Sequence, residues 1–156
     1  LLYDKTIEVF TKHKVFSRTE LEARAEINYE NYAKSINIEA KTMVDMAIHQ
    51  ILPAALRYTH ELCDTMTAKK IHGLPCNAEA SLLQRLSANT DKLHQAVEEL
   101  QEALGKLPKD AVLAAEYFHD VVVVKMNEVR SYADMLETLT DKSYWPYPTY
   151  SDLLYY

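Results

Sequence analysis

The chain has 156 residues, of which 48% are hydrophobic and 26% charged, and its formal net charge at pH 7 is −6. Only two glycines occur among many alanine, leucine, glutamate and lysine residues, which favours an all-α fold and excludes a β-sandwich or barrel. The acidic balance, without a clustered basic face, excludes a site for nucleic acid or for an anionic membrane surface.

The first predicted helix runs from Asp4 to about Lys14, because Asp4 is a capping residue and apolar side chains follow it at helical spacing. After a break, Ser17-Arg18-Thr19-Glu20 has the form of a capping box. In such a box the serine oxygen and the glutamate carboxylate each accept from an exposed backbone N–H group of the other residue. A second helix should therefore begin there.

The second predicted helix is longer than a globular domain of this size is wide. Pro53 removes one backbone donor and presses on the carbonyl of His49, so a kink is expected there, and the first strong stop is at Gly73. A helix from Arg18 to Ile71 would be about 80 Å long, against a radius of gyration of about 15 Å for a compact domain. This mismatch predicts an elongated molecule or a missing partner. The apolar stripe that indicates this helix consists of Leu21, Ala25, Tyr29, Tyr32, Ile36, Ala40, Met43, Ala47, Ile51, Ala54, Tyr58 and Leu62.

Two further helices are predicted to form an antiparallel hairpin. The first is capped by Asn77 and ends at Gly105, with a coiled-coil-like heptad of mainly leucine residues on one face. The next begins at Pro108, a residue suited to the first helical position, and runs to about Thr140. The short run Val121–Val124 could form a strand, but it lies inside a longer helical pattern, so a helix is favoured.

The last segment is WPYPTYSDLLYY, from Trp145 to Tyr156, and it combines aromatic residues with two prolines. It is expected to be an extended tail that forms neither a helix nor a regular strand. Aromatic side chains bury large areas and prolines lower the entropy lost on ordering, so this tail is predicted to pack against a surface. The residues expected to make that contact are Trp145, Pro146, Tyr147, Pro148, Tyr150, Leu153 and Leu154.

Two groups of residues have the composition of metal sites. His60, Cys63, His72 and Cys76 offer nitrogen and sulfur ligands for tetrahedral zinc, but no Cys-x-x-Cys knuckle presets the geometry. The segment from Glu116 to His119 is a single Glu-x-x-His unit, whereas di-iron bundles use two. Ordinary helix-end and surface positions explain both groups better.

No self-contained active site is evident in the sequence. His49 and His60 share a helix face, although Pro53 between them disturbs the alignment. Neither a glycine-rich phosphate loop nor a Gly-x-Ser-x-Gly elbow can be built, because the glycines are Gly73 and Gly105, each beside a turn. We therefore predict no catalytic, cofactor-binding or metal-ligating residue in this chain.

Other features set expectations about location and extent. The longest apolar run is too short to span a bilayer and no signal-peptide pattern is present, so a cytoplasmic protein without a membrane partner is expected. Cys63 and Cys76 are too few for a disulfide framework, so reduced thiols are expected. Because Leu1 is not an initiator methionine, the chain is expected to be a piece of a longer enzyme. It should form one helical domain over 1–156, with 145–156 as its tail.

Two stretches resemble the C-terminal region of the type III glutamine synthetases. One is NYENYAKSINIEAKTMVDMAIHQILPA, from Asn28 to Ala54, which is similar to the long helix of that family. The other is WPYPTY, which begins at Trp145, with the Leu153-Leu154 pair that follows it. Phenylalanine is expected in the family near Tyr147 and Tyr155. The resemblance covers nearly the whole chain.

The resemblance implies a non-catalytic helical C-terminal domain. It would contact the catalytic domain of the same polypeptide and the neighbouring subunits of a homo-oligomer. The parent enzyme would join ammonia to glutamate using ATP and a divalent metal (Mg or Mn), but the residues for that chemistry lie upstream and no position here matches them. A free-standing helical module that binds partner helices beside the heptad seam remains an alternative, as does a metal-binding helical bundle.

Overall fold

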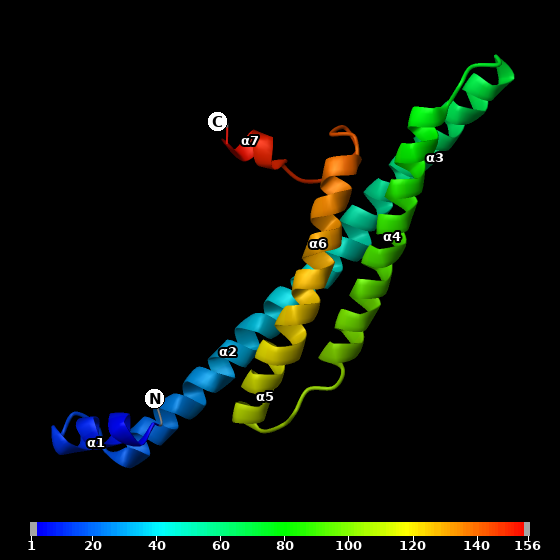
Figure 1. Cartoon of the computed structure of the whole chain (residues 1–156). Helices are drawn as coiled ribbons and strands as arrows, with labels where there is room; N and C mark the ends of the chain where they lie inside the picture. The colour runs from blue at the N-terminus through cyan, green and yellow to red at the C-terminus, as the bar shows by residue number, and fades with distance from the viewer. Residues whose placement is uncertain (1–2, 155–156) are drawn as a thin grey trace.

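The computed structural model describes residues 3–154, and all regular elements within that range are helices, which confirms the all-α prediction there. None of these helices is both long and apolar enough to cross a membrane. Figure 1 shows their arrangement. In chain order the elements are α1 (Asp4–Lys12), α2 (Arg18–Met46), the π-helical turn η1 (Ala47–Ile51), α3 (Leu52–Ile71), α4 (Asn77–Leu104), α5 (Ala111–Tyr117), the π-helical turn η2 (Phe118–Val122), α6 (Val123–Leu139) and α7 (Tyr150–Leu154).

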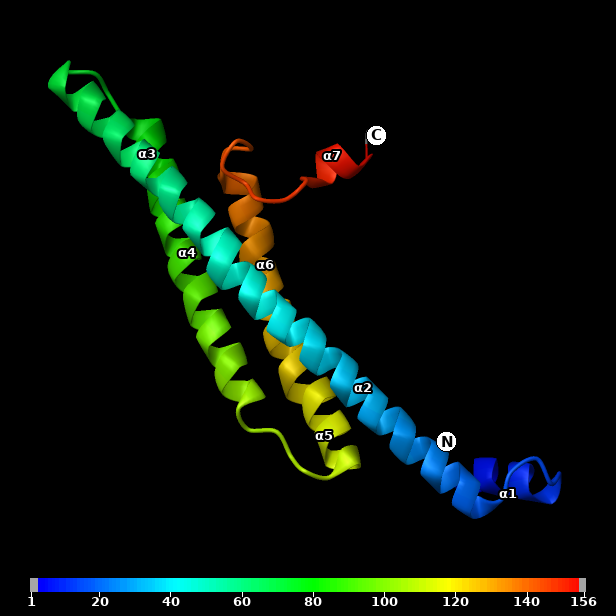
Figure 2. The ribbon, with the colours of Figure 1, turned by 180° about the vertical axis from the view of Figure 1, so that it is seen from behind.

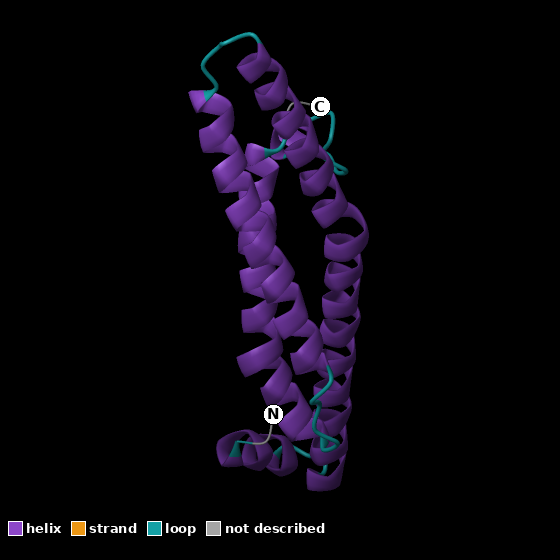
Figure 3. Cartoon of the chain, turned by 90° about the vertical axis from the view of Figure 1, so that its right-hand side faces the viewer, coloured by secondary structure: helices purple, strands orange, loops and turns teal. Residues whose placement is uncertain are grey.

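A single rod made of α2, η1 and α3 runs the length of the molecule (Figures 1 and 2). It begins with the predicted capping box. The Ser17 backbone N donates to Glu20 Oε2 at 2.7 Å, and the Glu20 backbone N donates to Ser17 Oγ at 3.3 Å. At about 1.5 Å per residue, the rod from Arg18 to Ile71 is about 80 Å long. Figure 3 shows α1 lying across its foot.

Pro53 does not end the rod, but the winding of the rod changes just before it. The π-helical turn η1 precedes α3, and Pro53 lies in the first turn of α3. Because proline has no N–H and crowds the carbonyl of His49, the α-helical hydrogen-bond ladder cannot pass this point unchanged. The second π-helical turn, η2, contains no proline. Val121–Val124 lies across the end of η2 and the start of α6, so it is helical as predicted.

The core forms where α4 and the α5–η2–α6 segment pack along the rod (Figure 1). The rod contributes small side chains: Ala33, Ala40 and Ala47 are buried at heptad spacing, which lets the neighbouring helices approach closely. Of the apolar stripe predicted for the rod, only Tyr32 is exposed. The other helices contribute aliphatic side chains with at most 1% exposure, namely Leu86, Leu93, Leu100, Val122, Val129 and Leu136.

The first two helix boundaries to differ from the predictions lie at α1 and α4. α1 ends at Lys12 rather than near Lys14, because Lys14 takes a left-handed backbone conformation with φ 54°. At the start of α4 the N-cap is Cys76, which makes no side-chain cap bond, and Asn77 is already helical. The expected cap at Asn77 is therefore wrong by one residue.

The start of the last long helix also differs from the prediction. Asp110, not Pro108, marks the start, because its Oδ1 accepts from the backbone N of Val112 and of Leu113, both at 3.0 Å. A carboxylate that satisfies two exposed N–H groups determines where a helix begins more strongly than a favourably placed proline does.

The final segment is not extended throughout. Tyr150–Leu154 forms the short helix α7, so the prediction of a wholly non-helical tail is wrong for these residues. Local capping explains the helix. The Thr149 backbone N donates to Asp152 Oδ2 at 3.0 Å, and the Asp152 backbone N donates to Thr149 Oγ1 at 3.4 Å.

Candidate interaction site

After α6 the chain turns back toward the rod through a segment that we call the strap, residues 141–149. Asp141 Oδ1 accepts from the Ser143 backbone N at 2.8 Å. The Asp141 carbonyl accepts from the backbone N of Tyr144 at 2.9 Å and of Trp145 at 3.2 Å. Because the hydroxyl and the N–H of Ser143 both donate to its carboxylate, the pKa of Asp141 is lowered. This turn directs the aromatic residues that follow toward the bundle.

The first aromatic residue of the strap lies against α3. The ring centroids of Tyr144 and Tyr58 are 5.4 Å apart, a normal distance for an aromatic pair. The Tyr144 hydroxyl donates to Glu61 Oε2 at 3.4 Å. Burial, and then the negative charge of Glu61, raise the pKa of Tyr144. The strap is therefore attached to the second half of the rod.

The next two aromatic residues cover the core. Trp145 and Tyr147 are half-buried and pack against the core cluster. Burial first, and then the charge of Asp45 on α2, raise the pKa of Tyr147. The Tyr147 hydroxyl oxygen is buried and has no hydrogen-bond partner within residues 3–154. The strap thus lies over its own bundle.

The other tail residues that the sequence singles out do not reach the core. Pro146 and Pro148 are exposed, on either side of Tyr147. Leu153 and Leu154 on α7 are 66% and 76% exposed. Tyr150 begins α7, and its side chain lies outside what the structure describes. The strap therefore packs against the core, whereas α7 does not.

α7 is held to the strap by polar contacts. Lys142 in the strap pairs with Asp152 in α7. The Thr149 hydroxyl also donates to Asp152 Oδ2 at 2.8 Å. These donors, Lys142 first, lower the pKa of Asp152 to about 2. As Figures 1 and 2 show, α7 stands off from the bundle on the side of α6 away from α4.

A groove of about 590 Å³ opens between the rod and α6, and we call it the α2–α6 groove. Three of its lining residues are methionines: Met43 and Met46 from α2, and Met126 from α6. A few polar residues, among them Glu39 and Asn127, share the lining. Its other apolar residues include Ile36, Ile38, Ile51, Val123, Val129 and Ala133.

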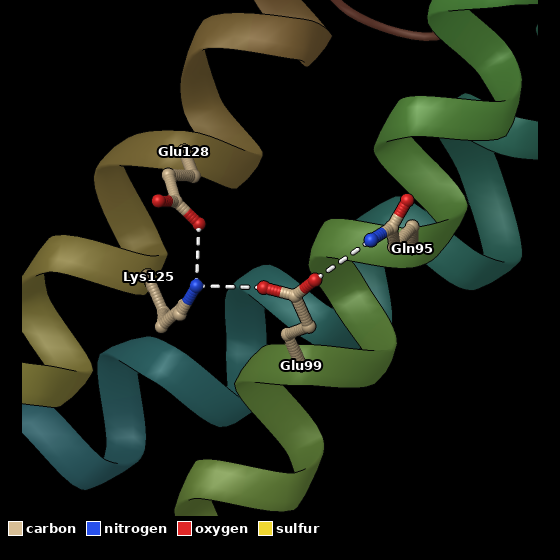
Figure 4. Close-up of polar contacts among 4 residues, drawn as sticks. All are labelled: Gln95, Glu99, Lys125 and Glu128. Carbon is tan, nitrogen blue, oxygen red and sulfur yellow. Dashed lines mark hydrogen bonds and ion pairs between the residues drawn. The ribbon is translucent and has the colours of Figure 1, made fainter.

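The opposite side of α6 is joined to α4 by a cluster of polar residues (Figure 4). Lys125 Nζ donates to Glu99 Oε2 at 2.6 Å and to Glu128 Oε2 at 2.9 Å, and Gln95 Nε2 donates to Glu99 Oε1 at 2.9 Å. The two glutamates raise the pKa of Lys125, while Lys125 and then Gln95 lower the pKa of Glu99. Because all these groups are paired with one another, the cluster serves to align α4 with α6.

The four residues considered for zinc are not brought together. His60 and His72 are a dozen positions apart on one continuous helix, which separates them by about 18 Å. Within residues 3–154, no group of three or more His, Cys, Asp or Glu is placed to hold a metal ion. His60 lies beside Asp64 instead, with Nε2 3.7 Å from Oδ2.

The remaining histidines considered above have carboxylate neighbours on the surface. His49 Nδ1 lies 2.9 Å from Asp45 Oδ1, and His119 Nδ1 lies 2.7 Å from Asp120 Oδ1. All four side chains are more than 60% exposed. The Glu-x-x-His unit at Glu116 therefore ends in a histidine that faces solvent.

Sequence reasoning missed two features of this region. The start of α7 had a visible signal, because Thr149-Tyr150-Ser151-Asp152 has the Thr-x-x-Asp form of a helix start. The α2–α6 groove had none, because it depends on how two helices distant in the sequence are placed.

Comparison with known proteins gives a consistent result. The glutamine synthetase C-terminal domain family matches residues 1–70. A glutamine synthetase of Butyrivibrio fibrisolvens is 33% identical over 97% of this chain and 22% of its own length. A type-3 glutamine synthetase of Dictyostelium discoideum is 32% identical over the same shares. A glutamine synthetase of Bacteroides fragilis is 24% identical over 94% of this chain and 21% of its own length.

The chain thus spans about a fifth of the length of the curated relatives that it matches. The family match covers the first part of the chain, and the relatives match nearly all of it. The chain is therefore similar to the C-terminal domain of the glutamine synthetases.

Proposed function

We propose that this chain is a non-catalytic helical domain of a larger glutamine synthetase and that it provides contacts within the assembled enzyme. The observation that carries the proposal is the coverage. A glutamine synthetase matches 97% of this chain, yet the match takes up only 22% of that protein. The ligation of ammonia to glutamate would then be carried out by the rest of the polypeptide.

ATP and a divalent cation, Mg²⁺ or Mn²⁺, would serve the parent enzyme, and the described residues fit neither group. They offer no cluster of His, Cys, Asp or Glu for a metal ion. Gly73 follows His72, the C-cap of α3, and Gly105 is itself the C-cap of α4. Since these are the two glycines of the chain, no glycine-rich loop is present to hold phosphates. In this proposal both groups bind outside this chain.

The surface of the bundle supports a role in contacts. The α2–α6 groove is open and mostly apolar, and Ile38 in its lining is 66% exposed. Contiguous exposed apolar surface usually marks an interaction site. The proposed partners are the catalytic part of the same polypeptide and neighbouring subunits of a homo-oligomer. We also propose a cytoplasmic location, where the free thiols of Cys63 and Cys76 would stay reduced.

In the alternative of a free-standing module, the surface that would bind a partner helix is buried. Its partner helix was to lie beside the heptad seam of α4. Leu86, Leu93 and Leu100 of that seam are all 0% exposed, since they pack inside the bundle. The burial of the seam thus favours the enzyme domain over this alternative.

Calorimetry tests the proposal that ATP does not bind to this chain. Titration of ATP with Mg²⁺ into the purified chain is expected to show no binding up to millimolar nucleotide. A dissociation constant in the micromolar range would overturn the assignment as non-catalytic. Helical content measured by circular dichroism in the same buffer would confirm that the chain is folded.

Deletion tests the contact role in the full-length parent protein. Removing the segment that corresponds to residues 1–156 is expected to reduce the number of subunits per oligomer, obtained by dividing the mass from light scattering by the mass of the shortened subunit. An unchanged number of subunits and unchanged specific activity would contradict the proposed role.

A further inference from the structure

The first helix, α1, has an apolar face that the bundle leaves largely uncovered. Tyr3, Ile7 and Phe10 follow one another at i, i+4 and i+7, which places them on one side of the helix. Within residues 3–154, no contact buries any residue of α1. Tyr3 is 81% exposed, and Val9, at the edge of this face, is 55% exposed.

α1 lies across the foot of the rod and is held there through aromatic side chains (Figure 3). The ring centroids of Phe10 and Phe16 are 5.7 Å apart, and the Arg24 guanidinium carbon lies 4.5 Å from the Phe16 centroid. α1 has nine residues, fewer than the roughly 12–15 below which an isolated helix is marginal in water. Its stability therefore depends on packing, and this chain supplies only part of that packing.

The comparisons indicate what covers the rest of this face. The matched family is a C-terminal domain, and the match begins at residue 1, so it includes α1. The relatives match nearly all of this chain but only about a fifth of their own length. In a protein of that layout, most of the polypeptide precedes α1 along the sequence.

We propose that the exposed apolar face of α1 docks on the part of the same polypeptide that precedes this chain in the parent glutamine synthetase. The inference rests on the proposed function and names the element that makes the contact. A surface joined by a short linker acts at an effective concentration of about millimolar, whereas a second copy must arrive by diffusion. Because α1 crosses the foot of the rod, its docking fixes the direction in which the rod projects.

Photo-crosslinking in the full-length parent protein tests this docking and identifies the occupant. A benzophenone amino acid replaces Val9, at the edge of the apolar face. The matched control carries the same group at Glu8, an exposed residue on the polar side of the same helix. After irradiation, a denaturing gel separates the products, and mass spectrometry identifies the joined peptides.

The expected product from Val9 has the mass of one polypeptide and joins α1 to a peptide that precedes residue 1. Its yield should be at least about fivefold higher than from Glu8, as for a contact confined to one helix face. Equal yields, or no product, would overturn the proposal. A product containing two polypeptides, or a joined peptide within residues 1–156, would also overturn it.

Hydrogen exchange gives a second measurement of the same contact. The backbone amides of residues 6–12 are expected to exchange at least about tenfold more slowly in the full-length parent than in the purified chain of residues 1–156. Amides around Leu93, whose side chain is 0% exposed, are the control and should exchange slowly in both proteins. Equal exchange of α1 in the two proteins would contradict the docking. Slower exchange in the purified chain at high concentration would assign the face to a second copy instead.

The outcomes separate this inference from the proposed function. If deletion of the domain lowers the number of subunits per oligomer while Val9 joins to nothing before residue 1, the proposed function stands and the docking of α1 is wrong. If Val9 joins to the preceding polypeptide while ATP binds this chain at micromolar concentration, the docking stands and the assignment as non-catalytic is wrong.

Discussion

At the scale of single residues, the position of α7 depends on one carboxylate. Asp152 accepts from the backbone N and the hydroxyl of Thr149 and pairs with Lys142. Lys142 precedes the aromatic part of the strap and Asp152 follows it, so the pair ties the start of the strap to α7. All these donors favour the charged form of the carboxyl group.

Acid is expected to break the tether between α7 and the strap. The pKa of Asp152 is about 2 in the folded chain against an ordinary value of 3.8, so its stabilising contribution is complete above pH 4. The contribution is lost as the pH falls from about 4 to 2, where the carboxyl group gains its proton. The carboxyl carbon shift of Asp152, followed by NMR, measures this titration. Lys142→Met should move the titration toward the ordinary value, and titration near 3.8 in the unchanged chain would contradict the tether.

The buried hydroxyl of Tyr147 leads to a prediction with an unusual sign. Because this oxygen has no partner within residues 3–154, Tyr147→Phe removes a desolvated polar group without removing the ring. We expect the free energy of unfolding to stay the same or to rise by up to about 1 kcal/mol. Urea denaturation measures it, and Tyr147→Ala, which also removes the ring, should lower it. A clear loss of stability in Tyr147→Phe would mean that the hydroxyl is hydrogen-bonded after all.

At the scale of elements, a helix with a long repeat of apolar residues could be predicted from the sequence. The helix starts that depend on a few local hydrogen bonds, at α5 and α7, were not predicted. The rod followed from its stripe and from the Ser17–Glu20 box. The start of α5 was placed at Pro108 because proline is favoured there, yet Asp110 binds two N–H groups. α7 was missed because aromatic and proline residues outweighed the Thr149–Asp152 pattern.

The corrected start of α5 can be tested directly. Asp110→Ala removes both cap bonds and is expected to lower the free energy of unfolding by about 1 kcal/mol. Asp110→Asn keeps an oxygen acceptor and should cost less. Pro108→Ala is the matched control: it removes no cap bond, so it should lower the free energy of unfolding by only about 0.4 kcal/mol through the greater freedom of the unfolded chain. Equal effects of Asp110→Ala and Pro108→Ala would restore Pro108 as the helix start.

At the scale of the whole molecule, the elongated shape follows from a rod that is longer than the helices packed on it (Figure 1). α4 and α6 meet the rod along part of its length and are joined to each other through Lys125. The candidate site lies where three parts of the chain meet: the rod, α6 and the tail. The rod and α6 could be predicted as helices, but the α2–α6 groove exists only through their relative placement. That placement depends on packing between residues far apart in the sequence, such as Ala40 and Leu93, which belong to one buried core cluster.

The two parts of the tail are expected to affect stability differently. A chain that ends at Thr149 lacks α7, whose leucines touch little of the described bundle, so its melting temperature should fall by less than about 1 °C. A chain that ends at Thr140 also lacks Trp145 and Tyr147, and the core surface under them becomes exposed. Uncovering two half-buried aromatic side chains costs roughly 1–3 kcal/mol, which at about 2–4 °C per kcal/mol lowers the melting temperature by several degrees. Differential scanning calorimetry of the two truncated chains and the full chain makes the comparison. Equal melting temperatures would show that the strap does not stabilise its own bundle, and an equal fall in both would assign a structural role to α7.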